Sequence, residues 1–240
     1  MNADGRTLPA DTAVLWQTLL DDVRAIGRQH PDAVLASSMA AEDMVLTHAI
    51  HTAAASIGIF TLDTGRLHAQ TLAMLDVIEA RYGVRPAVYY PDADAVQAHV
   101  REHGTHAFYE SVELRKVCCG LRKVEPLRRA LHGRSAWVTG QRREQAATRE
   151  TLAPAEDDPV FGLRKFNPLA AWTHADIWRV IRAFEVPYNP LHDEGYPSIG
   201  CEPCTRPVRA GEDLRAGRWW WESASGKECG LHAGNLFKPS

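Results

Sequence analysis

Long apolar runs, a signal-like leading segment and abundant cysteine are all missing from this 240-residue chain. No run approaches the ~18 apolar residues that a membrane-spanning helix requires. The first residues, MNADGRTLPADT, lack the basic and then apolar layout of a secretory signal. A domain of this length buries about 70% of its surface and needs no disulfides to fold. We therefore expect a cytoplasmic protein with no membrane partner, whose five cysteines stay reduced.

A strong net charge is also missing, because 27 Lys and Arg residues stand against 30 Asp and Glu residues, for a net charge of −3. The distribution is uneven, however. Between Arg115 and Arg149 the local net charge is +8, which leaves −11 for the rest of the chain. This arrangement favours a localised anionic ligand over a long polyanion, so we expect no nucleic-acid partner. Within this stretch we interpret Arg128 and Arg129 as a solvated helix face.

Apolar periodicity predicts alternating helices and strands along the first three quarters of the chain. The predicted helices cover residues 12–29, 43–54, 67–82, 112–131 and 173–184, and the predicted strands cover 33–36, 56–62, 87–90 and 135–139. This alternation predicts an α/β fold with a Rossmann-like parallel sheet covered on both faces. Such sheets bind ligands beyond the carboxyl ends of their strands, where Ser37, Ser38, Asp63 and Thr64 fall.

The last quarter of the chain has a different character. From Pro187 onward Gly, Pro, Trp and Cys crowd together with little periodicity. We predict an α/β domain over residues 1–186 and an irregular tail over 187–240, which form one structural unit.

Four of the five cysteines fall into two tight pairs, the adjacent Cys118 and Cys119 and the Cys201-x-x-Cys204 motif. A C-x-x-C motif alone suits a redox dithiol or half of a zinc site. Side chains of adjacent residues point apart, which suits the separated iron corners of an iron–sulfur cluster better than one small ion. We therefore favour iron–sulfur over zinc, with simple burial of a small residue as the remaining alternative.

The fifth cysteine, Cys229, is a candidate nucleophile. It lies between Lys227 and His232 next to a glycine, and cationic neighbours raise the thiolate fraction, although Glu228 acts the other way. An inert thiol is an equally good interpretation, since the local sequence does not show where His232 faces.

Two loops and an arginine pair have the features of an anion site. The Ser37–Asp43 segment joins a strand to a helix, where backbone N–H groups can receive a phosphate or sulfate, but it has no glycine. Its Glu42 and Asp43 can equally be first-turn carboxylates that stabilise the helix. The Leu62–Gly65 segment suits a ribose or base, or a generic turn. Arg215 and Arg218 suit bidentate binding of sulfate or phosphate, whereas we expect Trp219–Trp221 to pack the tail onto the domain.

Together these motifs resemble the assimilatory sulfonucleotide reductases, the adenylyl-sulfate (APS) and phosphoadenylyl-sulfate (PAPS) reductase family. The resemblance covers most of residues 35–232 and is most specific in the tail. The matching segments are Ser37–Asp43, Leu62–Gly65, Cys118–Lys123, Trp137–Arg143, Tyr188–His192, Tyr196–Thr205, Gly217–Trp219 and Lys227–His232.

This resemblance implies an adenine-nucleotide alpha hydrolase-like fold of the PP-loop type. It implies that Cys229 attacks the sulfur of the sulfonucleotide, expels AMP and becomes a cysteine S-sulfonate, from which thioredoxin releases sulfite. It also implies a set of substrate-binding residues. These are Ser37, Ser38, Asp43, Leu62, Asp63, Thr64, Lys123, Arg149, Arg215, Arg218 and His232, and among them Arg149 is assigned from its stretch of sequence alone.

The paired cysteines place the chain with the iron–sulfur branch of the family. The resemblance implies a 4Fe–4S cluster on Cys118, Cys119, Cys201 and Cys204, and APS as the substrate. The alternatives are a PAPS reductase, an ATP-splitting adenylating enzyme on the same fold, and an iron–sulfur or zinc regulator that binds nucleic acid. The glycine-free loop disfavours the ATP-splitting enzyme, and the nucleic-acid-binding regulator leaves Cys229 without a role. A homo-oligomer stays open.

Overall fold

The strand order of the central sheet reverses between its first and fourth strands. The computed structural model describes residues 7–222 and contains a six-stranded sheet in the order β3-β2-β1-β4-β6-β5. The strands are β1 (Val34–Ala36), β2 (Gly58–Leu62), β3 (Ala87–Tyr89), β4 (Ala136–Val138), β5 (Ala155–Asp158) and β6 (Leu163–Phe166). β2 and β3 lie on one side of β1, and β4, β6 and β5 lie on the other. The loops after β1 and β4 therefore diverge and leave a crevice between them.

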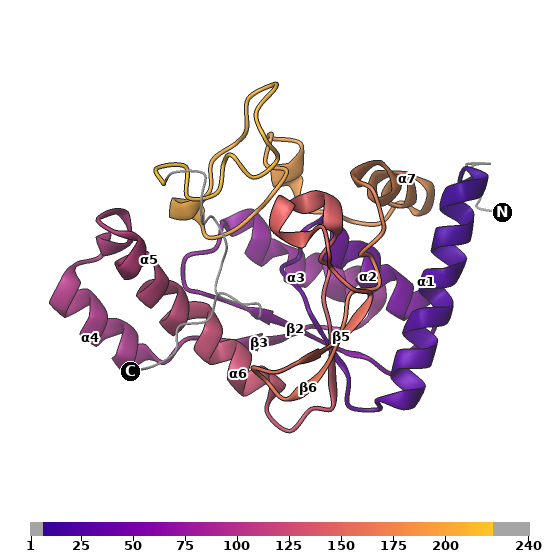
Figure 1. Cartoon of the computed structure of the whole chain (residues 1–240), viewed down its shortest axis with the longest axis horizontal. Coiled ribbons are helices and arrows are strands. Elements are labelled where there is room, and N and C mark those ends of the chain that lie inside the picture. The colour runs from indigo at the N-terminus through magenta and orange to yellow at the C-terminus, as the bar shows by residue number, and fades with distance from the viewer. Residues whose placement is uncertain (1–6, 223–240) are drawn as a thin grey trace.

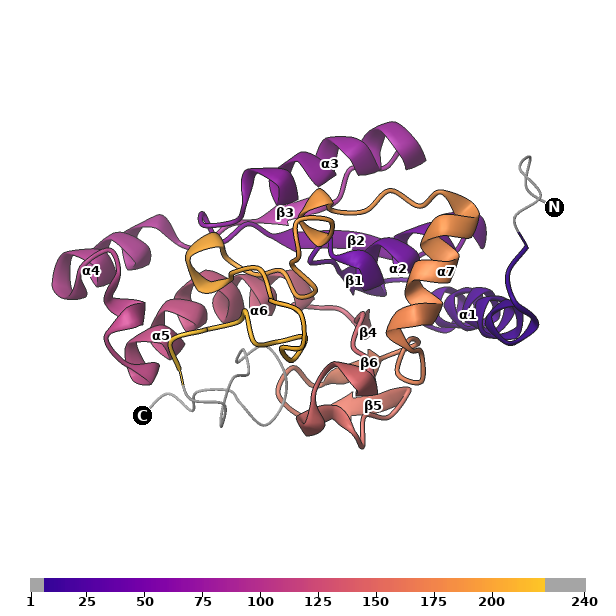
Figure 2. The same cartoon turned by 90° about the horizontal axis from the view of Figure 1, so that it is seen from above.

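Helices cover both faces of the sheet, as the sequence predicts. On one face lie α1 (Ala10–Gln29), α2 (Ala41–Thr52), α3 (Ala69–Tyr82) and α7 (His174–Phe184), and on the other lies α6 (Glu125–Leu131). Alternate strand residues enter the two cores. Leu35 and Val138 pack under the first group of helices, whereas Val34 and Trp137 pack against α6. Figure 2 shows the layers from above.

The predicted α/β fold is confirmed, and each predicted helix and strand is present with its ends shifted by a few residues. The sequence analysis missed α4 (Ala93–His103), β5 and β6. The predicted parallel pairing holds from β3 through β6, and β5 adds an antiparallel edge strand that the sequence analysis did not predict. The sequence of β5, Ala-Glu-Asp-Asp, has no intrinsic preference for a strand. It becomes one by pairing with β6 at the edge of the sheet, where Arg164 and Lys165 of β6 form ion pairs with Asp157 and Glu156 of β5.

The predicted helix over residues 112–131 carries an irregularity beside its cysteines. It consists of α5 (Val112–Cys119), a π-helical turn (Gly120–Val124) and α6. Such turns often occur at functional sites. This one contains Arg122 and Lys123, and it changes the direction in which these cations project relative to the cysteines before them.

The segment that follows α7 is irregular, as predicted, and docks onto the α/β domain above the sheet (Figure 1). Its only helical turns are Pro190–His192 and Glu202–Cys204 within residues 185–222. Cys201 pairs with Leu67 in a short antiparallel bridge, and the buried Asn189 side chain donates to Thr71 Oγ1 at 2.8 Å. Across residues 7–222, no helix combines the length and apolarity needed to cross a membrane. The division of the chain at residue 187 stays a prediction.

Candidate active site

A pocket of about 250 Å³ opens at the carboxyl ends of the strands, where the loops after β1 and β4 diverge. Its walls also include the π-helical turn and the segment after α7. Nine residues that the sequence analysis assigned to the substrate line it, namely Ser37, Ser38, Asp43, Leu62, Thr64, Lys123, Arg149, Arg215 and Arg218. Tertiary folding thus brings together residues separated by up to 181 positions in the chain.

The loop between β1 and α2 forms a tight turn without glycine. Met39 has a φ of 60°, in the left-handed region that favours glycine, and its side chain is completely buried. Burial of the side chain holds a backbone conformation that costs of order 1 kcal/mol or more. This turn leads into the amino terminus of α2, where Ala40 offers no side-chain cap.

His192, from the segment after α7, caps the amino terminus of α2 in place of the Ala40 side chain. Its Nε2 accepts the backbone N–H of Ala41 at 3.1 Å, and its Nδ1 lies 2.8 Å from the carbonyl oxygen of Tyr196. These two contacts require a neutral ring with its proton on Nδ1. Burial lowers the pKa of His192, which agrees with this state. The sequence analysis quoted His192 only as part of a motif.

Asp43 ties the two diverging loops together. Its Oδ2 accepts both the backbone N–H and the hydroxyl of Ser38, each at 2.6 Å. The Asp43 carboxylate also accepts the backbone N–H of Gly140. A Cβ at Gly140 would lie 2.3 Å from Asp43 Oδ1, so only glycine fits there. Burial raises the pKa of Asp43 to about 6, and the Ser38 hydrogen bonds oppose this rise. These contacts give Asp43 a role in shaping the pocket.

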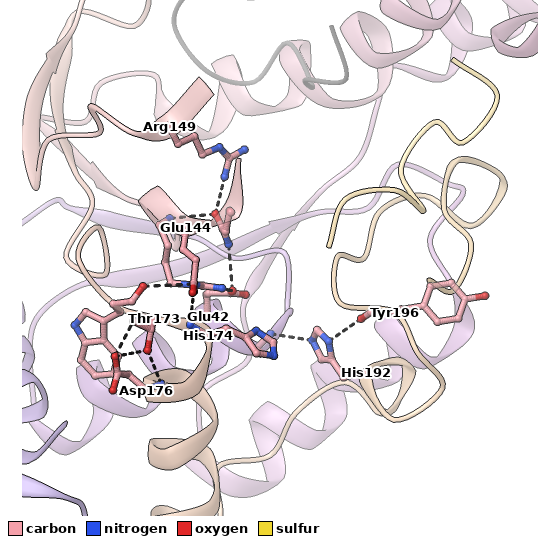
Figure 3. Close-up of polar contacts among 12 residues, drawn as sticks. Glu42, Glu144, Arg149, Thr173, His174, Asp176, His192 and Tyr196 are labelled. Atoms are coloured by element: carbon pink, nitrogen blue, oxygen red, sulfur yellow. Dashed lines mark hydrogen bonds and ion pairs between the residues drawn. The ribbon is translucent and has the colours of Figure 1, made fainter. Parts of the chain in front are cut away.

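A second buried carboxylate, Glu42, pairs with Arg142 (Figure 3). Glu42 Oε1 accepts Arg142 Nε at 3.0 Å and Nη2 at 2.8 Å, while Arg142 Nη1 donates to Glu144 at 2.8 Å. Arg142 is 1% exposed. A buried guanidinium needs such compensation, because the cost of removing a charge from water is several kcal/mol. The first-turn interpretation of Glu42 missed this partner, which lies 100 residues away in sequence.

The +8 stretch therefore overstates the exposed positive charge. Arg142 is buried with its carboxylates, and Arg115 makes a buried bidentate pair with Glu222, with both N–O distances 2.8 Å. Arg128 and Arg129 are exposed, as predicted, and Arg129 pairs with Glu125 one helical turn away. The cations that face the pocket come from separate elements instead.

Arg218 projects into the pocket through a close approach to the backbone. Its Nη1 donates to Ser198 Oγ and to the carbonyl of Ile199, each at 3.2 Å. A Cβ at Gly200 would lie 2.6 Å from Arg218 Nη2, so glycine at this position makes room for the guanidinium. Cζ of Arg218 also lies 4.8 Å from the centroid of the Trp219 ring, within the range of a cation–π contact. This packing fixes the direction of a cation that borders both the pocket and the cysteines.

The two cysteine pairs converge in one apolar cluster. Cys201, Cys204, Phe108 and Trp219 are buried, and Cys118, Cys119 and Trp221 pack against them. All four cysteines are free thiols, and Thr64 Oγ1 lies 3.2 Å from Cys201 Sγ. Burial raises the pKa of Cys204 to about 12, and Cys201 adds to the rise. The positive charges of Lys123 and Arg218 oppose it, so these cations lie near the cysteines as well as the pocket.

Four thiols and a buried N–H donor lie together at the cysteine cluster. Among residues 7–222, no three Cys, His, Asp or Glu side chains converge closely enough to hold a single metal ion. The buried indole N–H of Trp219, which is 1% exposed, has no hydrogen-bond partner within the described chain. An inorganic sulfide or thiolate could accept that hydrogen, since buried donors are otherwise satisfied. The residues present therefore fit an iron–sulfur cluster.

Three assigned residues are not placed in the pocket. Asp63 does not line it, and its Oδ1 instead accepts the backbone N–H of Gly65 at 2.8 Å in its own turn. Cys229 and His232 lie outside the described residues. The tryptophans of the tail behave largely as predicted, because Trp219 and Trp221 pack against the domain, but Trp220 is 50% exposed.

The fold and the pocket define an α/β protein with a mainly parallel sheet and a ligand site at the carboxyl ends of its strands, where the strand order reverses. Comparison with protein families identifies the group within this class. Residues 32–207 match the phosphoadenosine phosphosulfate reductase domain. The chain therefore belongs to the APS and PAPS reductase family, as the sequence analysis predicted.

Curated relatives and solved structures agree with this assignment. The chain is 62% identical over 207 residues to an adenosine 5'-phosphosulfate reductase from Burkholderia cepacia, covering 86% of this chain and 83% of the relative. It is 51% identical over 226 residues to a protein of the same name from Allochromatium vinosum, covering 94% and 87%.

Among solved structures, a phosphoadenylyl-sulfate reductase from Candida auris, determined as a phosphate complex, matches with a TM-score of 0.67 and 25% identity. That match covers 84% of this chain and 98% of the other. The FMN adenylyltransferase of Candida glabrata matches with a TM-score of 0.56 and 14% identity, covering 98% and 79%. The latter likeness concerns the fold alone.

Proposed function

We propose that the protein reduces APS to sulfite and AMP with thioredoxin as the electron donor. The observation that carries the proposal is the pocket at the strand ends, where Lys123, Arg149, Arg215 and Arg218 converge beside four clustered cysteines. A sulfonucleotide carries a phosphate and a sulfate, and guanidinium and ammonium groups match both. The names of the two curated relatives supply the substrate.

The proposed reaction has two steps. The thiolate of Cys229 attacks the sulfur of APS, an S–S bond forms, and the S–O bond to the phosphate breaks, so that AMP leaves with the electron pair. A thioredoxin thiolate then attacks Cys229 Sγ and releases sulfite, and the second thioredoxin thiol resolves the mixed disulfide. Two electrons pass from the dithiol to the sulfur.

The pocket cations act on the first step. A thiolate that approaches an anion meets like-charge repulsion, and Lys123, Arg215 and Arg218 offset it while they orient the sulfate. In this proposal Cys118, Cys119, Cys201 and Cys204 hold a 4Fe–4S cluster. A cluster bound there supplies a compact centre of charge beside Lys123. Ser37 and Ser38 border the phosphate at the start of α2, with the Ser37 hydroxyl as its donor, and Leu62 and Thr64 border the nucleoside.

Intact mass measurement tests the proposal. We expect the reduced full-length protein, incubated with APS but without thioredoxin, to gain the mass of one sulfonate. The Cys229→Ser variant should gain none while binding AMP as tightly as the parent. Sulfite production by that variant at a normal rate would overturn the proposal.

PAPS is the second candidate substrate, because the family model and the Candida auris structure carry that name. Rates measured with the two nucleotides separate the candidates. We expect faster sulfite release from APS, and the reverse order would favour PAPS. The nucleic-acid regulator is disfavoured, since Arg115 and Arg142 are buried with carboxylates rather than exposed.

A further inference from the structure

Gln145, which the sequence analysis did not single out, lies between the buried ion pair and a cation of the pocket. It ends the short helical turn Arg143–Gln145 after β4, and Arg149 ends the next turn. Both side chains line the pocket. Figure 3 shows the line of polar contacts that runs from Glu42 to Arg149.

The three contacts of Gln145 determine the orientation of its amide group. Its Oε1 accepts the backbone N–H of Arg142 at 3.0 Å and Nη1 of Arg149 at 2.6 Å. Its Nε2 donates to Glu42 Oε1 at 3.1 Å. In a flipped amide, Nε2 would face the N–H groups of Arg142 and Arg149, and Oε1 would face the Glu42 carboxylate. Only the observed orientation therefore satisfies all three contacts.

The charges around Gln145 favour a neutral side chain at this position. Glu42 already receives three hydrogen bonds and compensates Arg142. A carboxylate at position 145 would lie about 3 Å from Glu42 and repel it. It would also place a negative charge directly on the guanidinium of Arg149. An aliphatic side chain of equal length would leave the donor of Arg142 and the acceptor of Glu42 without their present partner.

We propose that Gln145 is a positioning residue, whose amide orients Arg149 toward the anionic part of the nucleotide without adding negative charge to the pocket. The inference rests on the proposed function only in taking the ligand to be an adenine nucleotide. Gln145 contacts Arg149, not the reacting atoms. Its effect is therefore on the binding of phosphate groups and not on the nucleoside.

Calorimetric titration of the full-length protein with AMP and with adenosine tests the proposal. Gln145→Met, which is similar in size but cannot form the hydrogen bonds, should weaken AMP binding about 3- to 10-fold. Gln145→Glu should weaken it further, by about 10-fold or more, and should reduce the salt dependence of binding, because the carboxylate pairs with Arg149. Adenosine binding should change less than about 2-fold in both variants.

The Arg149→Met variant completes a double-mutant cycle. In that background Gln145→Glu should weaken AMP binding less than it does in the parent, since the part of its effect that passes through Arg149 is gone. Equal effects of the two Gln145 variants, a parallel loss of adenosine binding, or a full effect of Gln145→Glu without Arg149 would each overturn the proposal. If Gln145→Glu does not fold, the same cycle is made with Gln145→Met. Its effect on AMP binding should then be smaller in the Arg149→Met background than in the parent, and an equal effect in both would overturn the proposal.

The outcome is separable from that of the proposed function. A protein that binds AMP as described but forms no S-sulfonate with APS contradicts the proposed reaction and supports the role of Gln145. Normal S-sulfonate formation together with unchanged AMP binding in Gln145→Glu supports the proposed reaction and contradicts the role of Gln145.

Discussion

The pocket has two walls that are held by different chemistry. We call the wall formed by α2 and the loop after β4 the polar wall. There the buried charges of Glu42 and Arg142 satisfy each other, and Gln145 extends their contacts to Arg149. We call the other side the cysteine wall, because Lys123 and Arg218 line the pocket there and lie near the clustered cysteines. Within the described chain, the indole N–H of Trp219 and Nε of Arg218 are buried on this side without hydrogen-bond partners. On the first wall the buried charges are paired with each other, although Gln141 Oε1 is buried there without a hydrogen-bond partner in the described chain. The second has the donors and thiols that a bound inorganic cluster would satisfy.

The largest expected effect comes from breaking the cysteine wall. Cys204→Ser should abolish both cluster and APS reduction, because a serine hydroxyl is a poor replacement for a thiolate ligand of iron. Iron and labile-sulfide content, visible absorption and sulfite production measure this. The exposed Trp220→Phe serves as the control and should retain both properties. Full APS reduction by a protein without a cluster would contradict the expected dependence of activity on the cysteine wall.

Breaking the polar wall should destabilise the fold itself. Arg142→Met leaves Glu42 as a buried carboxylate without its ion-pair partner, which should cost about 3–5 kcal/mol of unfolding free energy. Chemical denaturation measures the loss. Arg164→Met is the matched control, because Arg164 makes one exposed pair with Asp157 and should lose no more than about 1 kcal/mol. Similar losses in the two variants would show that the polar wall is not held by this pair.

A smaller and pH-dependent effect concerns His192, which connects the segment after α7 to the start of α2. Its folded-state pKa is lowered by burial, with a smaller contribution from His174, although Glu42 and Asp193 oppose this. The unfolded chain therefore binds a proton first as the pH falls below about 6.5, and stability present above that pH is lost. A proton on Nε2 would also remove the acceptor for Ala41.

His192→Gln sharpens this point, since an amide oxygen can accept the same N–H without titrating. The variant should lose less stability than the parent between pH 7 and pH 5, by at most about 1.4 kcal/mol per pH unit. Unfolding free energies at several pH values measure the difference. Parallel pH curves for the two proteins would contradict the role of His192.

The parts of the site that were predictable from the sequence are those whose chemistry is local. The Cys201-x-x-Cys204 motif, the adjacent Cys118 and Cys119, and the loop at Ser37 are contiguous patterns. The loop follows the predicted strand and the adjacent cysteines lie in the predicted helix, whereas the C-x-x-C motif lies in the segment predicted to be irregular. Arg218 lines the pocket, as the sequence analysis expected of a substrate-binding residue, and its role in binding an anion stays a prediction. Periodicity likewise predicted the main helices, whose buried faces repeat at a fixed spacing.

The contacts between distant residues were not predictable in this way. Nothing local distinguishes Arg142, which is buried, from Arg143 beside it, because the difference depends on Glu42 in another loop. The acidic β5 is a strand only because β6 lies alongside it. Gln145 has no motif-level signal of its own, and its importance depends on which groups meet at its two ends.

The sequence by itself determined the fold class, the family and the residue types that can carry the reaction, because hydrophobic periodicity and short motifs are properties of neighbouring residues. Only the tertiary structure decided which charges face the pocket and which are neutralised inside the protein. Burial and pairing depend on the whole chain, since the free energy of a charge is set by the solvent it loses and the partner it gains.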